Sequence, residues 1–433
     1  MEVPSRIGVS QIKGIKGEIT VSGDKSISHR AVILNSIARG KGIIKNFLES
    51  DDCLNTLDSM RQSGVEISRD NQNNIVINGK GLYSLKEAED IIDMGNSGTG
   101  LRLMAGILSG HDFLSILTGD GSLRKRPMDR IVKPLKKMGA DISGRKGDQF
   151  APLVIKGGNL NAVEYELPMP SAQVKSAILL AGLYTEGTTR ILEPVRSRNH
   201  SELMLKWFGA DIKLGEGEIG ITGGREIEAQ EIFVPGDISA AAFFIVLALL
   251  TKSSEILIKN VGINLTRCGI LTILNRMGAK IEILNKSKVC GEEMGDLYVR
   301  SSELKATTIF EEEVPFTIDE LPILAVAACF AQGETKILGA RELRYKESDR
   351  IKTMVTELRK FGITVEEIED GMIIEGGSNL SGAHCIGYGD HRVAMSLVIA
   401  GMTAAGNTTI DDTYCIRTSF PNFLDLLDSI KCN

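Results

Sequence analysis

The stretch LKKMGADI at residues 135–142 decides how this chain is organised, because it returns almost unchanged as LKWFGADI at residues 205–212. Related copies read MRQSGVEI at 60–67, LNRMGAKI at 274–281 and LRKFGITV at 358–365. Each copy has the pattern of an amphipathic helix that ends at a glycine and is followed by the alternating residues of a strand. We predict that these glycines are left-handed helix C-caps: Gly64, Gly139, Gly209, Gly278 and Gly362.

A second pattern alternates with the first: a polar turn, a helix that is apolar on nearly all sides, and the start of a strand. Helices of this kind belong in a core, whereas helices with one charged face belong at the surface. The apolar helices are predicted to begin near Asp24, Asn96, Ser171, Asp237, Asp319 and Asp390. The sequence therefore predicts an α/β fold of two similar domains, each of three repeated α/β units with buried helices surrounded by sheet and outer helices, an inside-out α/β barrel.

The boundary between the two domains is expected at Val234-Pro235-Gly236-Asp237, which reads as a linker. The strand-like stretch from Ile7 to Val21 has no buried helix before it, so it is expected to pair with the C-terminal half. We therefore expect one domain from residues 1–21 plus 237–433 and another from 22–236, with hinge crossings near 21–23 and 235–237.

Composition narrows the classes of function. The net charge of −6 argues against a nucleic-acid binder, because such proteins are usually basic. Seven cysteines without a CxxC pair fit a reducing compartment better than a disulfide framework. The N-terminal residues lack the apolar core of a signal peptide, and the longest apolar run, Ile238 to Leu250, is too short to span a bilayer. We expect a cytoplasmic protein that binds neither membrane nor nucleic acid.

Polar side chains gather where the buried helices are predicted to begin. A helix N-terminus presents unpaired N–H groups and a partial positive charge of about half an electron, so it attracts phosphate and carboxylate groups. The first start adds Lys25, Ser26, Ser28 and Arg30, the second is the glycine-rich turn GNSGTGLR at 95–102, and the third adds Ser171 and Gln173. Ordinary helix caps would explain the second and third starts equally well. Several such starts facing one cleft would hold two small anions between the halves of the chain.

Charged segments outside these turns extend the candidate site. The basic loops LRKRP at 123–127 and EPVRSRNH at 193–200 precede surface helices, so we expect Arg126 and Arg198 to contact ligand, although solvated loops are the usual meaning of such runs. In the second half, IDE at 318–320, RYKESDR at 344–350 and GDHR at 389–392 place acids among cations. Asp319 could be a plain N-cap, but a carboxylate among cations can also act as a general acid or base.

Seven segments occur in the order and spacing of one known family: SGDKSISHR at Ser22, GNSGTGLR at Gly95, RP at Arg126, SAQ at Ser171, RYKESDR at Arg344, GDHR at Gly389 and TSFP at Thr418. Over essentially its whole length the chain resembles the 5-enolpyruvylshikimate-3-phosphate synthase family. The resemblance implies transfer of the enolpyruvyl group of phosphoenolpyruvate to the 5-hydroxyl of shikimate 3-phosphate through a tetrahedral ketal, with release of phosphate, on the shikimate pathway to chorismate and the aromatic amino acids. No metal or organic cofactor is implied.

The resemblance also implies roles for individual residues. Shikimate 3-phosphate would be bound by Lys25, Ser26, Arg30, Ser171, Gln173, Arg198, Asp319 and Lys346. Phosphoenolpyruvate would be bound by Lys25, Gly98, Arg126, Gln173, Arg350, Arg392 and Arg417. Asp319 and Lys25 would serve the attacking hydroxyl, and Glu347 would serve the methylene carbon. Leu103 stands where many relatives have proline and Arg417 where some have lysine. Because Ala in place of Gly98 is associated with insensitivity to glyphosate in the family, the intact glycine predicts inhibition by glyphosate.

Two other functions compete with this interpretation. An enolpyruvyl transferase that acts on UDP-N-acetylglucosamine would be expected to carry a reactive cysteine in a mobile loop, whereas the only cysteine of the first half, Cys53, lies in the helix-like segment DDCLNTL. A non-catalytic anion-binding protein, or a cyclase-like relative acting on RNA ends, is the second alternative. Retention of Asp319, Lys346 and Glu347 argues against the non-catalytic protein, and the acidic net charge argues against a protein acting on RNA.

Overall fold

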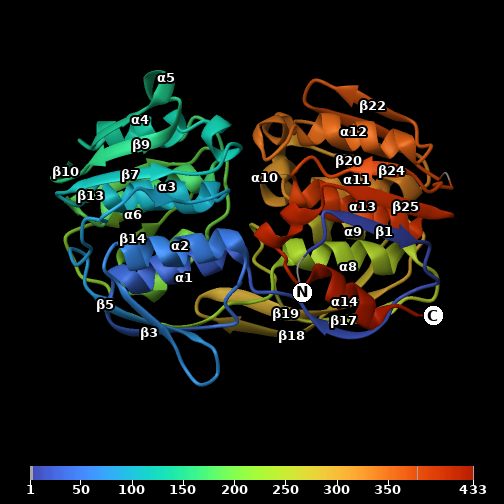
Figure 1. Ribbon diagram of the computed structural model, residues 1–433, viewed down its shortest axis with the longest axis horizontal. Coiled ribbons are helices and arrows are strands. Elements are labelled where there is room, and N and C mark those ends of the chain that lie inside the picture. The colour runs from blue at the N-terminus through green and yellow to red at the C-terminus, as the bar shows by residue number, and fades with distance from the viewer. Residues whose placement is uncertain (1–2, 378, 433) are drawn as a thin grey trace. The chain divides into compact units, whose positions relative to one another are not determined.

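The computed structural model describes residues 3–377 and 379–432, and the chain divides into two compact lobes (Figure 1). The N-terminal lobe comprises Gly23–Val234 and Lys288–Glu292. The C-terminal lobe comprises Met1–Ser22, Pro235–Ser287 and Glu293–Asn433. The chain therefore passes from one lobe to the other next to residues 22 and 235, and again on either side of Lys288–Glu292. Nothing in the sequence singles out that last short segment.

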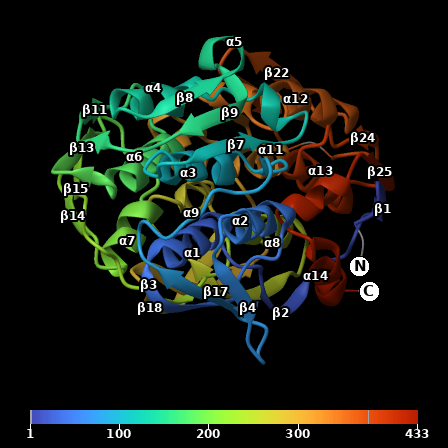
Figure 2. The same ribbon diagram turned by 60° about the vertical axis from the view of Figure 1, so that its left-hand side comes forward.

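The N-terminal lobe is built around three buried helices, α1 (Lys25–Ile37), α3 (Gly98–Leu108) and α6 (Ala172–Gly182). Helices α3 and α6 lie side by side (Figures 1 and 2). The more polar helices α2 (Asp51–Gln62), α4 (Asp129–Lys137) and α7 (His200–Trp207) lie outside them. Each of these outer helices keeps one exposed face, in keeping with its charged residues.

Three four-stranded sheets complete the N-terminal lobe, in the strand orders β16-β3-β5-β4, β6-β7-β9-β8 and β11-β13-β15-β14. Their strands are β3 (Arg39–Lys45), β4 (Glu66–Arg69), β5 (Ile75–Lys80), β6 (Ile92–Asp93), β7 (Leu114–Thr118), β8 (Asp141–Gly144), β9 (Phe150–Lys156), β11 (Glu164–Glu166), β13 (Thr188–Leu192), β14 (Asp211–Leu214), β15 (Glu218–Thr222) and β16 (Glu231–Phe233). A parallel two-stranded pair joins β10 (Leu160–Asn161) to β12 (Thr185–Glu186). Short helical turns are η1 (Leu123–Lys125) and α5 (Arg145–Asp148).

The C-terminal lobe repeats this plan with the buried helices α8 (Ile238–Leu250), α11 (Leu321–Phe330) and α13 (His391–Thr403). Outer helices are α9 (Gly269–Arg276), α12 (Arg350–Lys360) and α14 (Phe423–Ile430). Shorter helical segments are η2 (Glu311–Glu313), α10 (Val314–Thr317), η3 (Arg341–Tyr345) and η4 (Tyr414–Thr418). The six buried helices within the described residues thus occur as three in each lobe, which confirms the predicted fold class.

The sheets of the C-terminal lobe have the strand orders β18-β19-β17-β2, β20-β21-β23-β22 and β1-β25-β24. Their strands are β1 (Arg6–Ser10), β2 (Lys16–Thr20), β17 (Glu255–Gly262), β18 (Lys280–Val289), β19 (Glu292–Arg300), β20 (Thr308–Ile309), β21 (Glu334–Ile337), β22 (Val365–Ile368), β23 (Gly371–Glu375), β24 (His384–Ile386) and β25 (Asn407–Asp411). The two N-terminal strands belong here, because β1 pairs with β25 and β2 pairs with β17.

Local sequence explains where the helices end and begin. All five repeat glycines adopt a positive φ, between 82° at Gly64 and 103° at Gly139, as a left-handed C-cap requires. Asp24, Ser171, Asp237 and Asp390 each accept a backbone N–H at the start of a buried helix. Such caps satisfy donors that would otherwise be left unpaired in the core.

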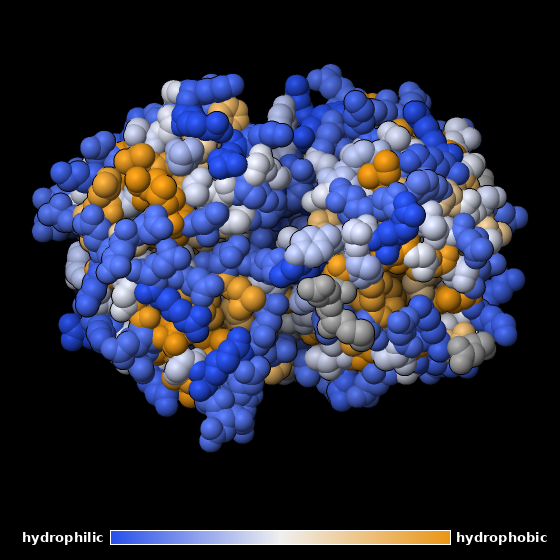
Figure 3. Space-filling view, viewed as in Figure 1, coloured by the Kyte–Doolittle hydropathy of each residue, from blue (hydrophilic) through white to orange (hydrophobic). Residues whose placement is uncertain are grey.

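Apolar side chains are concentrated in the interiors of the lobes. Helix α8 is the most apolar of the buried helices, and nearly all of its side chains are buried. The visible surface is mainly hydrophilic, with apolar atoms in scattered patches (Figure 3). Within the described residues, no helix combines the length and the apolar character that crossing a membrane requires.

Candidate active site

Arg30 is a buried cation of the N-terminal lobe that several hydrogen bonds hold in place. It lies in α1 and is only 4% exposed. Its guanidinium donates from Nε to Ser201 Oγ at 2.7 Å, from Nη2 to Ser176 Oγ at 2.7 Å and from Nη1 to the Ser26 carbonyl oxygen at 2.9 Å. Burial lowers the pKa of Arg30 to about 10, so the group remains cationic at neutral pH. The hydroxyl partners of Arg30 carry no compensating charge.

Lys25 begins the same helix and is paired with a carboxylate. Its Nζ lies 2.5 Å from Asp52 Oδ2 in α2, and both side chains are largely covered. Asp52 is not predictable as the partner of Lys25, because nothing in the order of residues shows that α2 packs against the start of α1. The thiol of Cys53 points to the Lys25 carbonyl oxygen at 3.8 Å, and burial raises its pKa, so it is not a reactive thiolate.

The glycine-rich turn brings two arginines to the start of α3. Arg126 donates to Asn96 Oδ1 at 2.5 Å and to the Asn96 carbonyl oxygen at 3.3 Å. Arg102, one turn into α3, donates to the Gly98 carbonyl oxygen at 3.3 Å and to Gln173 Oε1 at 2.6 Å. A Cβ at Gly98 would lie 2.9 Å from Arg102 Nη1 and 3.3 Å from Arg126 Nη1, so the missing side chain is what admits both guanidiniums.

Gln173 connects the second and third predicted helix starts. Besides accepting from Arg102, its Nε2 donates to Thr99 Oγ1 at 2.8 Å. Ser171 caps α6 by accepting from the Val174 N–H. Arg198 lies in the loop before α7, and its charge is near enough to Arg30 to lower the pKa of that residue. The N-terminal lobe thus gathers predicted residues from α1, α3, α6 and two loops. Arg102, the last residue of the segment GNSGTGLR, joins these residues through its contact with Gln173.

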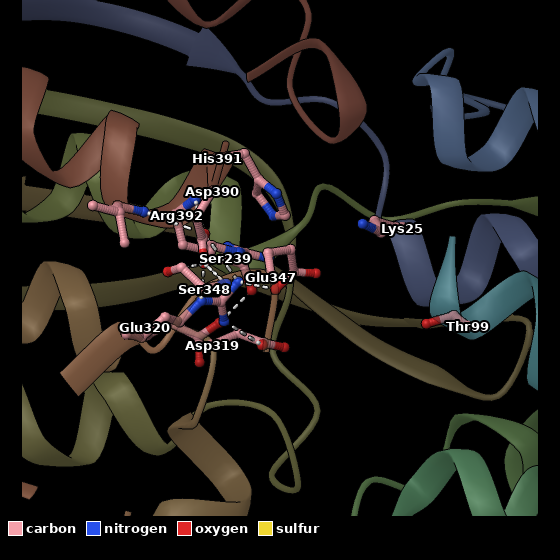
Figure 4. Close-up of polar contacts among 12 residues, drawn as sticks. Lys25, Thr99, Ser239, Asp319, Glu320, Glu347, Ser348, Asp390, His391 and Arg392 are labelled. Carbon is pink, nitrogen blue, oxygen red and sulfur yellow. Dashed lines mark hydrogen bonds and ion pairs between the residues drawn. The ribbon is translucent and has the colours of Figure 1, made fainter. Parts of the chain in front are cut away.

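Asp390 organises the corresponding region of the C-terminal lobe (Figure 4). Its carboxylate is fully buried and caps α13 by accepting from the Arg392 N–H at 2.9 Å. It also accepts from Ser348 Oγ at 3.0 Å and from Arg350 Nε at 2.9 Å. Asp390 therefore joins the GDHR and RYKESDR segments, which lie far apart in the sequence.

Arg350 is surrounded by carboxylates. In addition to Asp390, it contacts Glu347 Oε2 at 2.6 Å through Nη2 and Asp319 Oδ1 at 3.4 Å through Nη1. The side chain is almost fully buried, and the neighbouring carboxylates raise its pKa despite that burial. Asp319 is not the N-cap of α11, since the helix begins at Leu321 after Glu320. Its carboxylate accepts from Arg350 Nη1 instead.

Three further cations belong to this lobe. Arg392 is only 7% exposed, and within residues 3–377 and 379–432 its guanidinium has no hydrogen-bond partner. Burial lowers the pKa of Lys346, which is also influenced by Asp319, Glu342 and Glu347. Arg417 hydrogen-bonds the Tyr414 hydroxyl, and its guanidinium lies 4.9 Å from the centre of that ring. The guanidinium of Arg392 is therefore available to an anion from outside the protein.

A second buried ion cluster includes Glu320, the neighbour of Asp319 in sequence, and its members come from separate segments. Arg267 donates to Glu320 Oε1 at 2.8 Å and to Asp237 Oδ1 at 3.1 Å, and Ser239 hydrogen-bonds Glu320. The cluster ties the start of α8 to the start of α11. Among the described residues, no group of three or more His, Cys, Asp or Glu side chains is arranged to hold a metal ion.

Comparison with known proteins shows the family to which the chain belongs. Residues 9–427 match the model of the family described as EPSP synthase (3-phosphoshikimate 1-carboxyvinyltransferase). A 3-phosphoshikimate 1-carboxyvinyltransferase of Geobacter metallireducens is 52% identical over 422 residues, covering 98% of each chain. One from Thermodesulfovibrio yellowstonii is 50% identical, covering 98% of this chain and 99% of the relative. The chain belongs to the EPSP synthase family of transferases.

Solved structures give the same result. An EPSP synthase structure from Acinetobacter baumannii superimposes with a TM-score of 0.88 at 43% identity and covers 98% of each chain. The enolpyruvyl transferase NikO from Streptomyces tendae has a TM-score of 0.77 at 17% identity, covering 98% of this chain and 96% of NikO. That second likeness is one of fold.

Proposed function

We propose that this chain transfers the enolpyruvyl group of phosphoenolpyruvate to the 5-hydroxyl of shikimate 3-phosphate, releasing phosphate, as a step of chorismate and aromatic amino-acid biosynthesis. Family membership supports the activity. The observation that carries the chemistry is that one buried arginine, Arg350, contacts two carboxylates, Asp319 and Glu347, through different nitrogens. A reaction with two proton transfers at neighbouring atoms needs two such groups in fixed positions.

The N-terminal lobe supplies a cationic, hydroxyl-rich surface for shikimate 3-phosphate in this proposal. Arg30 and Arg198 offer positive charge, while Ser26, Ser171 and Gln173 offer hydrogen-bonding groups to a phosphate or a ring hydroxyl. Because the hydrogen bonds of Arg30 go to hydroxyl and carbonyl oxygens and none goes to a carboxylate, its guanidinium can pair with an anion. Asp319 and Lys346 of the C-terminal lobe complete the proposed contacts.

Phosphoenolpyruvate carries a phosphate and a carboxylate, and the proposed partners come from both lobes. Lys25, the Gly98 backbone, Arg126 and Gln173 are contributed by one lobe, and Arg350, Arg392 and Arg417 by the other. The contacts within the protein favour different tasks for the two buried arginines. Arg392 is available for a direct ion pair, whereas Arg350 already contacts three carboxylates and would chiefly orient Glu347 and Asp319.

The proposed steps balance as an addition followed by an elimination. The 5-hydroxyl oxygen bonds to the central carbon of phosphoenolpyruvate, its proton passes to Asp319 or Lys25, and Glu347 donates a proton to the methylene carbon. The resulting tetrahedral ketal then loses a proton from the new methyl group to Glu347 while the carbon–phosphate oxygen bond breaks. Arginines that surround the ligand stabilise the charge that develops on the departing phosphate.

Two features accompany the proposed activity. Glyphosate is a proposed inhibitor, because Gly98 has no side chain that would displace the guanidiniums of Arg102 and Arg126. A cytoplasmic location is supported by the cysteines, all seven of which are free thiols.

Phosphate release from the purified protein tests the substrate pair directly. We expect release only when shikimate 3-phosphate and phosphoenolpyruvate are both present, and none when UDP-N-acetylglucosamine replaces shikimate 3-phosphate. Release with UDP-N-acetylglucosamine alone as the acceptor would favour the other enolpyruvyl transfer. Binding of both anions without any release would favour the non-catalytic alternative.

A further inference from the structure

A buried lysine in α6 lies at the centre of a network that the proposed mechanism does not use. The side chain of Lys175 is 0% exposed. Its Nζ lies 2.9 Å from Glu193 Oε1 and 2.7 Å from Glu202 Oε1, and both carboxylates are themselves at most 6% exposed. A buried charge needs such partners to offset the cost of leaving water.

Each carboxylate of this network lies in or beside a segment that carries a proposed substrate contact or holds one by a hydrogen bond. Glu193 Oε1 accepts from the Ser197 N–H at 3.0 Å and from Ser197 Oγ at 2.5 Å, which fixes the loop directly before Arg198. Glu202 lies in the first turn of α7, next to Ser201, which accepts from Arg30 Nε. Ser176, next to Lys175 in α6, accepts from Arg30 Nη2 and hydrogen-bonds Ser201.

We infer that Lys175 is a positioning residue for shikimate 3-phosphate: its ammonium group holds Glu193 and Glu202 in place and neutralises charge that would otherwise compete with this anionic substrate for Arg30 and Arg198. The inference rests on the proposed function. Lys175 itself touches no substrate, since its nitrogen is enclosed by the two carboxylates. It acts through the three segments that it joins, namely α6, the loop 193–199 and the start of α7.

The net charge of the Lys175 network predicts the direction in which the affinity for shikimate 3-phosphate changes. Lys175, Glu193 and Glu202 together carry one net negative charge, and Glu202 is one of the charges that act on Arg30. Replacement of Lys175 by methionine leaves two buried carboxylates without their shared cation. These two carboxylates would then attract the neighbouring arginines and repel the phosphate of an incoming substrate. The proposed phosphoenolpyruvate contacts at Gly98 and Arg126, and Arg102 beside them, would be undisturbed.

The test measures the two substrates separately in Lys175→Met. We expect the Kd for shikimate 3-phosphate, measured by calorimetry, and its KM to rise by about 10- to 100-fold. The KM for phosphoenolpyruvate should change by less than about threefold, because its proposed contacts share no partner with Lys175. Lys206→Met makes the same change at an exposed lysine of α7 and serves as the matched control.

A charge-restoring variant separates positioning from mere packing. Lys175→Met combined with Glu202→Gln has the same net charge as the native network, so it should recover a substantial part of the affinity for shikimate 3-phosphate. A role in packing alone would give no such recovery. Should Lys175→Met not fold, Ser197→Ala removes one hydroxyl contact to Glu193 and is expected to raise only the KM for shikimate 3-phosphate.

Outcomes for the two proposals are distinguishable. If the native protein binds shikimate 3-phosphate and turns it over but Lys175→Met and Ser197→Ala leave its Kd and KM unchanged, the role of Lys175 is overturned and the proposed function stands. Equal increases in both KM values would also overturn it. A native protein that fails to bind shikimate 3-phosphate would instead overturn the proposed function.

Discussion

Arg350 and Asp390 form a buried ion pair in which Nε lies 2.9 Å from Oδ2 and Nη2 lies 3.2 Å from Oδ1. The two residues are 40 positions apart in the sequence, at the starts of α12 and α13. The same Asp390 carboxylate also caps α13 immediately before Arg392. One acid thereby sets the position of two arginines that are proposed to act on phosphoenolpyruvate.

Asp390→Asn should destabilise the protein even though asparagine is a good helix cap. The neutral side chain leaves the buried guanidinium without its main counter-charge, which costs about 3–5 kcal/mol when a buried pair is broken. Denaturant unfolding measures the change, with Asp425→Asn, an exposed residue of α14, as the control. A loss of stability no larger than that of the control would show that Glu347 and Asp319 alone compensate Arg350.

Glu347→Gln should slow turnover by about 10²- to 10⁴-fold while substrate binding is largely kept, because the amide cannot exchange a proton with the methylene carbon. Its side chain still fits beside Arg350 Nη2, which lies 2.6 Å from Glu347 Oε2 in the native protein. Steady-state kinetics and calorimetric binding of shikimate 3-phosphate measure the two effects. Glu369→Gln alters an exposed glutamate of the same lobe for comparison. Unchanged kcat would remove Glu347 from the proton transfers.

Gly98→Ala should preserve the fold and weaken the binding of both phosphoenolpyruvate and glyphosate. The new methyl group would approach Arg102 Nη1 to 2.9 Å and Arg126 Nη1 to 3.3 Å, and these flexible side-chain ends can move away. Displaced guanidiniums no longer meet the ligand in their native positions, so the KM for phosphoenolpyruvate and the inhibition constant of glyphosate should each rise about tenfold or more. Gly121→Ala, with nothing within 4 Å of the added carbon, is the matched control. Native-like inhibition of Gly98→Ala would contradict the proposed contact.

Affinity for shikimate 3-phosphate should fall at alkaline pH because of Lys346. Burial lowers the pKa of this lysine from the ordinary 10.5, so its proposed substrate-binding cation is lost at a lower pH than for an exposed lysine. The KM for shikimate 3-phosphate should therefore begin to rise below pH 10.5 in the native protein. In Lys346→Met this rise of KM with pH should be absent. Lys352→Met, at an exposed position of α12, should keep the native profile.

The titration of Lys346 does not destabilise the folded protein at alkaline pH, so unfolding caused by this group does not explain the predicted fall in affinity for shikimate 3-phosphate. A lysine whose pKa is lowered in the folded state binds fewer protons there than in the unfolded chain. Its contribution to the free energy of unfolding therefore increases as pH rises through that range. A native KM that stays constant up to the ordinary lysine pKa would contradict the assignment of Lys346.

The repeat pattern predicted the fold because it depends on local chemistry. A helix that ends at a left-handed glycine and a helix that is apolar all round are both recognisable from adjacent residues, so Gly139 and the start of α8 needed no knowledge of the rest of the chain. Helix caps such as Asp24 and Ser171 are equally local. Asp319 differs because a distant arginine holds its carboxylate.

Side-chain partners that come together only through tertiary packing could not be predicted from the sequence. Asp52 meets Lys25, Arg102 meets Gln173, and Lys175 meets Glu202 across separate elements. The complete burial of Lys175 depends on the packing of α6, which the order of residues does not show. Charged residues within otherwise apolar helices are the one signal that could have singled it out.

Phosphorus NMR of the purified protein with shikimate 3-phosphate and phosphoenolpyruvate tests the central claim most directly, because it shows which phosphate leaves. The proposed transfer predicts that the phosphoenolpyruvate signal is replaced by inorganic phosphate, that the phosphate on the shikimate ring stays attached, and that omission of either substrate abolishes the change. Loss of the ring phosphate, release without shikimate 3-phosphate, or no change with both substrates present would contradict the proposed transfer.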